Sequence, residues 1–259
     1  MVTAKRKNNE WYSEEAGFFG SGYLKEYASV LSLEKTKKEV AFLVKALHLK
    51  RGMKILDLCC GHGRHTIPLA KKGYVMTGQD INGFFLKEAV KATERAKLKI
   101  RWIKSDMGEI PFEEEFNVVL NLFTAFGYFE KDKENEKVLH QVAKALKRKG
   151  KFFIDVQNRE RIIKQFSPNN WRENEDNSFL LERREFDFVT GSILEQRIRI
   201  SKKGKIEKLP LITLRMYTVA ELVAMCKRAG LHIKSIYGDY DEVPLTFESK
   251  RCIIVAEKK

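Results

Sequence analysis

Two glycines and two aspartates stand where a nucleoside-binding turn needs them. Gly61 and Gly63 follow the apolar segment 53–58, and because glycine has no Cβ, a ligand can approach the main chain closely there. Asp57 lies near the end of that segment, at the edge where open α/β sheets bind ligands, and could hold a ligand ammonium group directly or through water. Asp80 comes 23 positions later, about the offset at which an acid on the second strand accepts both ribose hydroxyls. Together the four residues predict a nucleotide-type site.

The turn lacks one feature of a dinucleotide site. The G-x-G-x-x-G fingerprint has a third glycine where this chain has Thr66, and that glycine normally lets the helix approach the pyrophosphate. Its absence favours S-adenosylmethionine over a dinucleotide as the ligand. The alternative is a structural turn that binds nothing, because short glycine motifs also arise by chance.

Alternating strands and helices would bring these residues to one sheet edge. Apolar residues at helical spacing predict a first helix over 34–48. The pattern then predicts strands near 53–58, 74–79, 99–104, 116–122 and 151–157, with helices near 64–72, 84–97 and 132–147. Alternation at this pace indicates a doubly wound α/β fold with a mostly parallel sheet.

The pattern changes after Val156. Segments 178–189, 192–201 and 205–216 alternate apolar with polar residues, with turns at Thr190-Gly191 and Lys203-Gly204, and predict an antiparallel three-stranded insertion. A helix capped by Thr218 and Glu221 and ended by Gly230 follows, and strands 232–238 and 250–257 complete the main sheet. We therefore expect four parts: an N-terminal tail and aromatic lid (1–33), a cofactor-binding core (34–158), an insertion covering the active site (159–216) and the C-terminal part of the core sheet (217–259).

Composition favours a soluble cytoplasmic protein. The segment Met1–Glu10 is polar and basic, unlike a signal peptide or anchor, and the uncharged run Phe116–Phe129 is too short to span a bilayer as a helix. The net charge of +14 favours weak attraction to anions such as RNA, but its lysines and arginines are spread widely. The spread indicates a solvated surface more than a nucleic-acid site. We expect no membrane partner, and either a monomer or a homodimer.

The cysteines predict neither disulfides nor a metal centre. Cys226 and Cys252 fall in apolar segments, which suits reduced core thiols. The cluster at the turn lacks the paired ligand spacing of structural zinc sites; it comprises Cys59, Cys60, His62 and His65.

At this point the chain resembles the class I S-adenosylmethionine-dependent methyltransferases over almost its whole length. The matching segments are Leu56–Gly63, Gly78–Asp80, Ser105–Met107 and Asn121–Phe129. More narrowly, Phe126–Phe129, Leu214–Thr218 and Tyr237–Tyr240 look like small-molecule members, among them sugar-amine N-methyltransferases. The resemblance implies a Rossmann-like fold with a seven-stranded sheet and a β layer over the active site.

The resemblance also implies residues that hold S-adenosyl-L-methionine. Asp106 would accept from the adenine amino group, and the backbone amide of Met107 would donate to the ring. A solvated Asp and a buried Met are the alternative. The full set of implied cofactor residues is Asp57, Cys59, Gly61, Gly63, Asp80, Ile81, Asp106, Met107, Asn121 and Tyr23.

The segment after the fourth strand lies where such enzymes place the methyl acceptor. It has neither the Asn/Asp-Pro-Pro-aromatic motif of adenine or glutamine methylation nor the Pro-Cys nucleophile of cytosine C5 chemistry. Instead it carries Phe123 and Thr124, which we expect to contact the acceptor, and Tyr128, which we expect to be catalytic. Covalent catalysis through a cysteine is therefore not expected.

Aromatic residues cluster ahead of the fold, at positions 11, 12, 18, 19 and 23. They either dock on the core or form a lid, in which Tyr12 or Tyr23 reaches the methionine end of the cofactor. Similar lids carry an active-site tyrosine at the position that Tyr12 matches. At the end of the insertion, Arg215 could hold an acidic substrate group and Tyr217 could act in catalysis. The alternative for this pair is a surface ion pair and a half-buried ring.

These observations predict a methyltransferase that acts on nitrogen or oxygen of a small molecule. An RNA methyltransferase is the first alternative, favoured by the charge, and it would need cations gathered at the pocket mouth. A non-catalytic protein that binds S-adenosylmethionine is the second.

Overall fold

A computed structural model describes residues 11–28, 30–174 and 176–259. The segment Met1–Glu10, for which we predicted neither a signal peptide nor an anchor, lies outside the described residues, as does part of the expected tail 1–33. Among the residues that are described, no helix combines the length and apolar character needed to cross a membrane.

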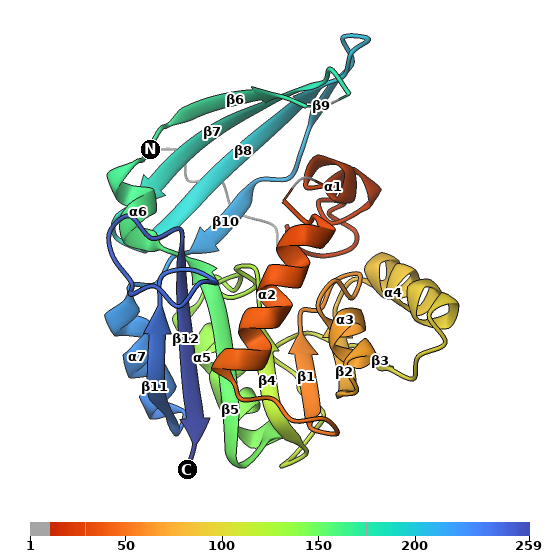
Figure 1. The fold of residues 1–259 in the computed structure, drawn as a ribbon. Helices are drawn as coiled ribbons and strands as arrows, with labels where there is room; N and C mark the ends of the chain where they lie inside the picture. The colour runs from red at the N-terminus through yellow and green to blue at the C-terminus, as the bar shows by residue number, and fades with distance from the viewer. Residues whose placement is uncertain (1–10, 29, 175) are drawn as a thin grey trace.

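The larger sheet has, within the described residues, seven strands in the order β11-β12-β5-β4-β1-β2-β3 (Figure 1). The parallel strands are β1 (Lys54–Leu58), β2 (Val75–Asp80), β3 (Arg101–Lys104), β4 (Phe116–Asn121) and β5 (Leu146–Gln157). β12 (Arg251–Lys258) lies antiparallel between β5 and β11 (Leu231–Tyr237). The predicted doubly wound, mostly parallel sheet is confirmed. Strand order reverses between β1 and β4, the kind of place where such sheets bind ligands.

Helices cover both faces of this sheet. α2 (Leu33–Ala46) and α3 (Thr66–Lys71) pack on one face, α5 (Asp132–Ala145) and α7 (Val219–Arg228) pack on the other, and α4 (Gly83–Arg95) lies against β2 and β3. Side chains alternate between the two cores because successive residues of a strand face opposite ways. Phe153 joins the α2 side, while Phe152 and Ile154 join the α5 side, all without solvent exposure.

Most element boundaries fall close to the predicted ones, with one clear exception. The helix predicted to reach residue 147 ends at Ala145, and β5 begins at Leu146, five residues before the predicted strand. The capping box at Thr218 and Glu221 is present at the start of α7, as expected. Two short helices, α1 (Ser21–Glu26) and α6 (Arg159–Lys164), were not predicted. Six residues show no clear helical period, and unlike α3 neither helix lies between two parallel strands, where the alternation of strands and helices predicts one.

A second, antiparallel sheet lies beyond the carboxyl ends of the parallel strands (Figure 1). Its described strands number five rather than the predicted three: β6 (Asn169–Glu173), β7 (Phe179–Asp187), β8 (Ser192–Ile200), β9 (Ile206–Lys208) and β10 (Ile212–Arg215). The predicted strand 205–216 is divided around Pro210, which cannot donate a ladder hydrogen bond. β6 escaped prediction because its residues are mostly polar.

Candidate functional site

The turn after β1 has the left-handed backbone that its glycines suggest. Gly61 has φ +55° and Gly63 has φ +81°, and Cys59 adopts φ +61° without being a glycine. A left-handed residue with a Cβ costs roughly 1–2 kcal/mol, and such strain is concentrated at functional sites. A Cβ on Gly61 would meet only Phe85, at 3.9 Å, so the space beside this residue is open. A Cβ on Gly63 would come within 2.8 Å of Trp102, so that glycine serves packing.

Asp80 joins the end of β2 to this turn. One carboxylate oxygen accepts from the Gly61 backbone N–H at 2.7 Å, and the other accepts from the Asn82 backbone N–H at 2.8 Å. Burial raises the pKa of this carboxyl to about 6, although these amide bonds favour its ionised form. Each oxygen keeps a further lone pair for a ligand hydroxyl.

Asp57 is buried at the end of β1, where its carboxylate accepts from the Thr66 hydroxyl at 2.5 Å. Desolvation raises the pKa of Asp57, and the nearby His65 opposes this shift. Thr66, at the position of the missing third glycine, therefore positions the first acid of the site.

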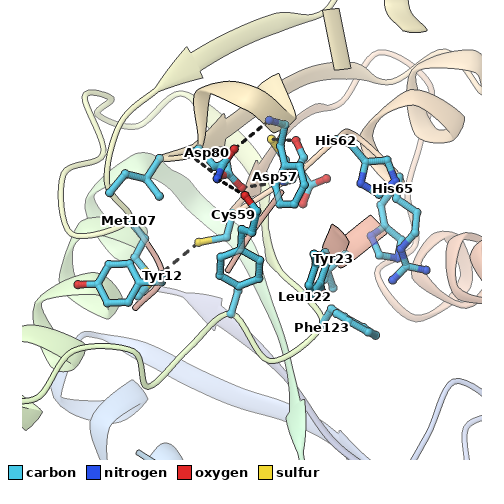
Figure 2. Close-up of a pocket in the computed structure, with 18 of the residues that line it drawn as sticks. Tyr12, Tyr23, Asp57, Cys59, His62, His65, Asp80, Met107, Leu122 and Phe123 are labelled. Carbon is cyan, nitrogen blue, oxygen red and sulfur yellow. Dashed lines mark hydrogen bonds between the residues drawn. The ribbon is translucent and has the colours of Figure 1, made fainter. Parts of the chain in front are cut away.

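Both acids line one cavity, a concave site of the kind in which proteins bind small molecules. Figure 2 shows Asp80 and Met107 toward one end and His62, His65 and Phe123 toward the other. Predicted site residues that line the cavity are Tyr12, Tyr23, Asp57, Cys59, Gly61, Asp80, Ile81, Asp106, Met107, Phe123 and Tyr128. The structure thus brings together the ends of β1 and β2, the segment after β3, the loop after β4 and the N-terminal aromatics.

Aromatic rings from the N-terminal segment and from the loop after β4 form part of the cavity wall. Tyr12 and Tyr128 lie with ring centroids 5.6 Å apart, and Trp11 lies 4.6 Å from Tyr128. Tyr23 contacts Phe85 of α4 at 5.9 Å. Burial raises the pKa values of Tyr23 and Tyr128, so both phenols stay protonated at neutral pH.

Three basic residues of the turn also line the cavity, although the sequence did not lead us to assign them to the ligand site. They are His62, Arg64 and His65. Arg64 donates to Glu39 of α2 and to the Thr36 hydroxyl, and His65 Nε2 lies 2.7 Å from the same Glu39 carboxylate. Burial alone would raise the pKa of Glu39, but the bonds from His65 and Arg64 outweigh this effect and lower the pKa. Burial, with a contribution from Arg64, lowers the pKa of His62. The sequence feature that could have identified these three residues is their position directly within the glycine turn.

Five predicted site residues do not line the cavity. Gly63 faces the Trp102 ring, as described above. Asn121 is buried at the end of β4, its amide N–H reaches Cys59 Sγ at 3.9 Å, and its Oδ1 has no partner among the described residues. The other three are Thr124, Arg215 and Tyr217.

Thr124 and the end of β10 are engaged in structural contacts. The Thr124 hydroxyl accepts from the Gln157 backbone N–H and from Arg251, each at 3.0 Å. Arg215 pairs with Glu221 at 2.6 Å and with Asp132 at 3.2 Å, and Tyr217 donates to Asp132 at 2.7 Å. In the structure Arg215 and Tyr217 contact residues of α5 and α7 and do not line the cavity.

Comparison with known proteins points in one direction. A family described as "Methyltransferase domain" matches residues 55–150. The protein YqeM of Bacillus subtilis (strain 168) is 24% identical over 208 residues, covering 79% of this chain and 84% of YqeM. The fold is shared with the CcbJ methyltransferase of Streptomyces caelestis (TM-score 0.76, 22% identity, 85% and 89% of the two chains). It is also shared with CalS10 of Micromonospora echinaspora, solved with S-adenosylmethionine bound (TM-score 0.66, 19% identity, 88% and 92%).

Proposed function

We propose that this chain is an S-adenosylmethionine-dependent methyltransferase that transfers the methyl group to a nitrogen or oxygen atom of a small molecule. The observation that carries this proposal is the aromatic cover formed by Tyr12, Tyr23 and Tyr128, which lines the same cavity as Asp57 and Asp80. CalS10, with the same fold, is an amino pentose methyltransferase.

The residues of the cavity fit the cofactor. Space is open beside Gly61, and Asp80 presents both carboxylate oxygens at the strand end. In this proposal the ribose is held by Asp80 and Ile81, the adenine by Asp106 and Met107, and the methionine end by Asp57 and Tyr23. Asn121, predicted from the sequence to bind the cofactor, does not line the cavity and has no part in this proposal.

The protein's contribution to the reaction is placement. The bound cofactor supplies a methyl group that its sulfonium already activates. Phe123 and the aromatic cover hold the acceptor against that end of the cavity and exclude water, so that proximity and orientation supply most of the acceleration. Phe123 is fixed for this purpose, because its left-handed backbone (φ +61°) is held by a bond from its N–H to Asp155 at 3.0 Å.

An amine acceptor must lose its proton to react. His62 faces the cavity and, with its pKa lowered, is neutral at pH 7 and able to accept that proton. The phenols of Tyr12 and Tyr128 are placed to orient the acceptor, and Tyr128, whose pKa is raised, acts as a hydrogen-bond donor and not as a base.

The cavity wall supports a small acceptor more than RNA. An RNA site gathers lysines and arginines around its mouth. Of these residue types, only Arg64 lines the cavity within the described chain, and it is paired with Glu39.

The test supplies the protein with a methyl-labelled cofactor and separate metabolite, RNA and protein pools. We expect label in the metabolite pool. Label confined to RNA or to protein would overturn the small-molecule assignment, and an absence of label from all pools despite cofactor binding would favour a non-catalytic binding protein.

A further inference from the structure

Residues 11–28, here called the cap segment, line part of the cofactor cavity and pack against Ile212 of the second sheet. Besides its ring contacts with Tyr128 and Phe85, the cap segment is attached by hydrogen bonds to β3 and to the start of α4. Glu14 accepts from Lys104 Nζ at 2.9 Å and from the Gly83 backbone N–H at 3.0 Å, and Asn82 donates to the Phe19 carbonyl at 2.9 Å. The Lys104–Glu14 pair is largely exposed, so it contributes little.

The attachment of the cap segment to the second sheet is of a different kind. Glu26, at the end of α1, has a side chain only 4% exposed, and it accepts from three arginines. Arg172 of β6 and Arg197 of β8 bond one oxygen at 3.0 and 3.2 Å, and Arg199 of β8 bonds the other at 2.7 Å. We call this cluster the Glu26 clamp. A buried carboxylate held by several charged donors resists separation, because an unpaired charge in that place is costly.

The Glu26 clamp reaches the cavity through two tyrosines. Arg197 also donates to the Tyr27 hydroxyl at 2.8 Å, and the Tyr27 ring stacks on Tyr23 with centroids 4.4 Å apart and planes inclined by 26°. Tyr23 in turn forms part of the cavity wall. A shift of α1 away from the second sheet would therefore move Tyr23 out of the cofactor site.

The second sheet does not need Glu26 for its own charge balance. Arg197 also pairs with Glu195, and Arg199 also pairs with Glu207 at 3.1 Å. Arg172 is partly exposed and can be solvated by water. Removal of the Glu26 charge should therefore loosen the end of α1 from the second sheet while the sheet stays folded. The start of the cap segment keeps its own contact with this sheet, because Trp11 donates to the Thr213 carbonyl of β10 at 2.9 Å.

We propose that Glu26 is a positioning residue, which fixes Tyr23 in the wall of the cofactor cavity by clamping the cap segment to the second sheet. The second sheet thereby sets the affinity for S-adenosylmethionine without contributing an atom to the cofactor site. This inference depends on cofactor binding alone, so the identity of the methyl acceptor does not affect it.

The first test measures the Kd of S-adenosylmethionine by calorimetry. Glu26→Gln should raise this Kd roughly tenfold, and Glu26→Asp, which keeps the charge, should recover part of the loss. The matched control is Glu207→Gln, which removes a carboxylate from the same Arg199 at an exposed site away from the cap segment. Its Kd should stay within about twofold of the wild type.

Two further measurements distinguish positioning from a general loss of stability. If Glu26 acts through Tyr23, the double variant Glu26→Gln/Tyr23→Ala should bind no more weakly than Tyr23→Ala alone. Amide hydrogen exchange in the cofactor-free Glu26→Gln protein should accelerate in α1 and remain unchanged in β8.

Should Glu26→Gln fail to fold, Arg172→Gln decides the question, because it removes one exposed donor of the clamp and should raise the Kd about twofold to threefold. The proposal is overturned if the folded Glu26→Gln protein, or in its place Arg172→Gln, keeps the wild-type Kd. Multiplicative effects in the double variant would also overturn it.

Discussion

Cofactor affinity should depend on the ionisation of Asp80. Its two oxygens already accept backbone N–H groups at 2.7 and 2.8 Å, and its pKa is raised to about 6 by burial. In the proposed site the ribose hydroxyls would donate to this carboxylate, so the cofactor would favour the ionised form. If only that form binds, the Kd of S-adenosylmethionine should be constant above pH 7, about twofold higher at pH 6 and about elevenfold higher at pH 5.

The same raised pKa fixes the sign of the effect on stability. The folded protein binds the Asp80 proton more tightly than the unfolded chain, whose carboxyl has its ordinary pKa of 3.8. The stabilisation from the neutral carboxyl is therefore complete below pH 3.8 and lost as the pH rises through 6. Cofactor affinity and the stability of the cofactor-free protein should change in opposite directions with pH.

The substitution that tests the role of the Asp80 charge is Asp80→Asn. It preserves the shape of the side chain but places an amide donor against one of the two backbone N–H groups or against the ribose. We expect weaker binding by about 1–3 kcal/mol at pH 7.5, or about 5- to 150-fold in Kd, and no pH dependence from this site. Titration calorimetry from pH 5 to 8 measures both quantities, with the exposed Asp176→Asn as control. A wild-type Kd that is flat from pH 5 to 7, or an identical slope in Asp80→Asn, would refute the reasoning.

Three further substitutions test the geometry of the turn and the placement of a residue outside the cavity. Gly61→Arg should abolish cofactor binding, because its side chain would fill the open space beside the turn; measurable affinity by equilibrium dialysis would contradict this. Gly78→Ala should lower the free energy of unfolding by about 2–4 kcal/mol in a urea titration, since its Cβ would lie 2.3 Å from the Trp102 ring; an unchanged midpoint would show that the ring moves freely. Tyr217→Phe should leave cofactor Kd unchanged and cost about 1 kcal/mol of stability through the lost bond to Asp132; a large rise in Kd would place this ring in the site after all.

The sequence was most informative where local pattern and function coincide. Gly61 and the two acids could be located because parallel strands end at one edge, so residues at strand ends converge whatever their separation in the chain. The first core helix, the parallel strands and the α7 capping box were predictable because each depends on short-range periodicity or spacing in the sequence.

Other features depend on partners far away in the chain. The Glu39 contacts of Arg64 and His65 join α2 to the turn, and no local pattern reports such a pairing. Arg215 was placed near the acceptor from its position at the end of the insertion, but Asp132 and Glu221 hold it elsewhere. Short elements such as α1 and β6 were missed because tertiary contacts, and not periodicity, define them.

The position of β12 constrains the order of events during synthesis. β12 is made after β11 yet lies between β11 and β5, so β11 has no neighbour in the sheet until residues 251–258 have left the ribosome. Until then β11 and α7 expose apolar surface that the finished sheet covers, while the nucleoside-binding half, β1 to β4, already has its pairing partners. A nascent chain stalled before β12 would therefore hold a nearly complete ligand turn beside an unpaired strand edge, the kind of surface that chaperones recognise and that promotes aggregation.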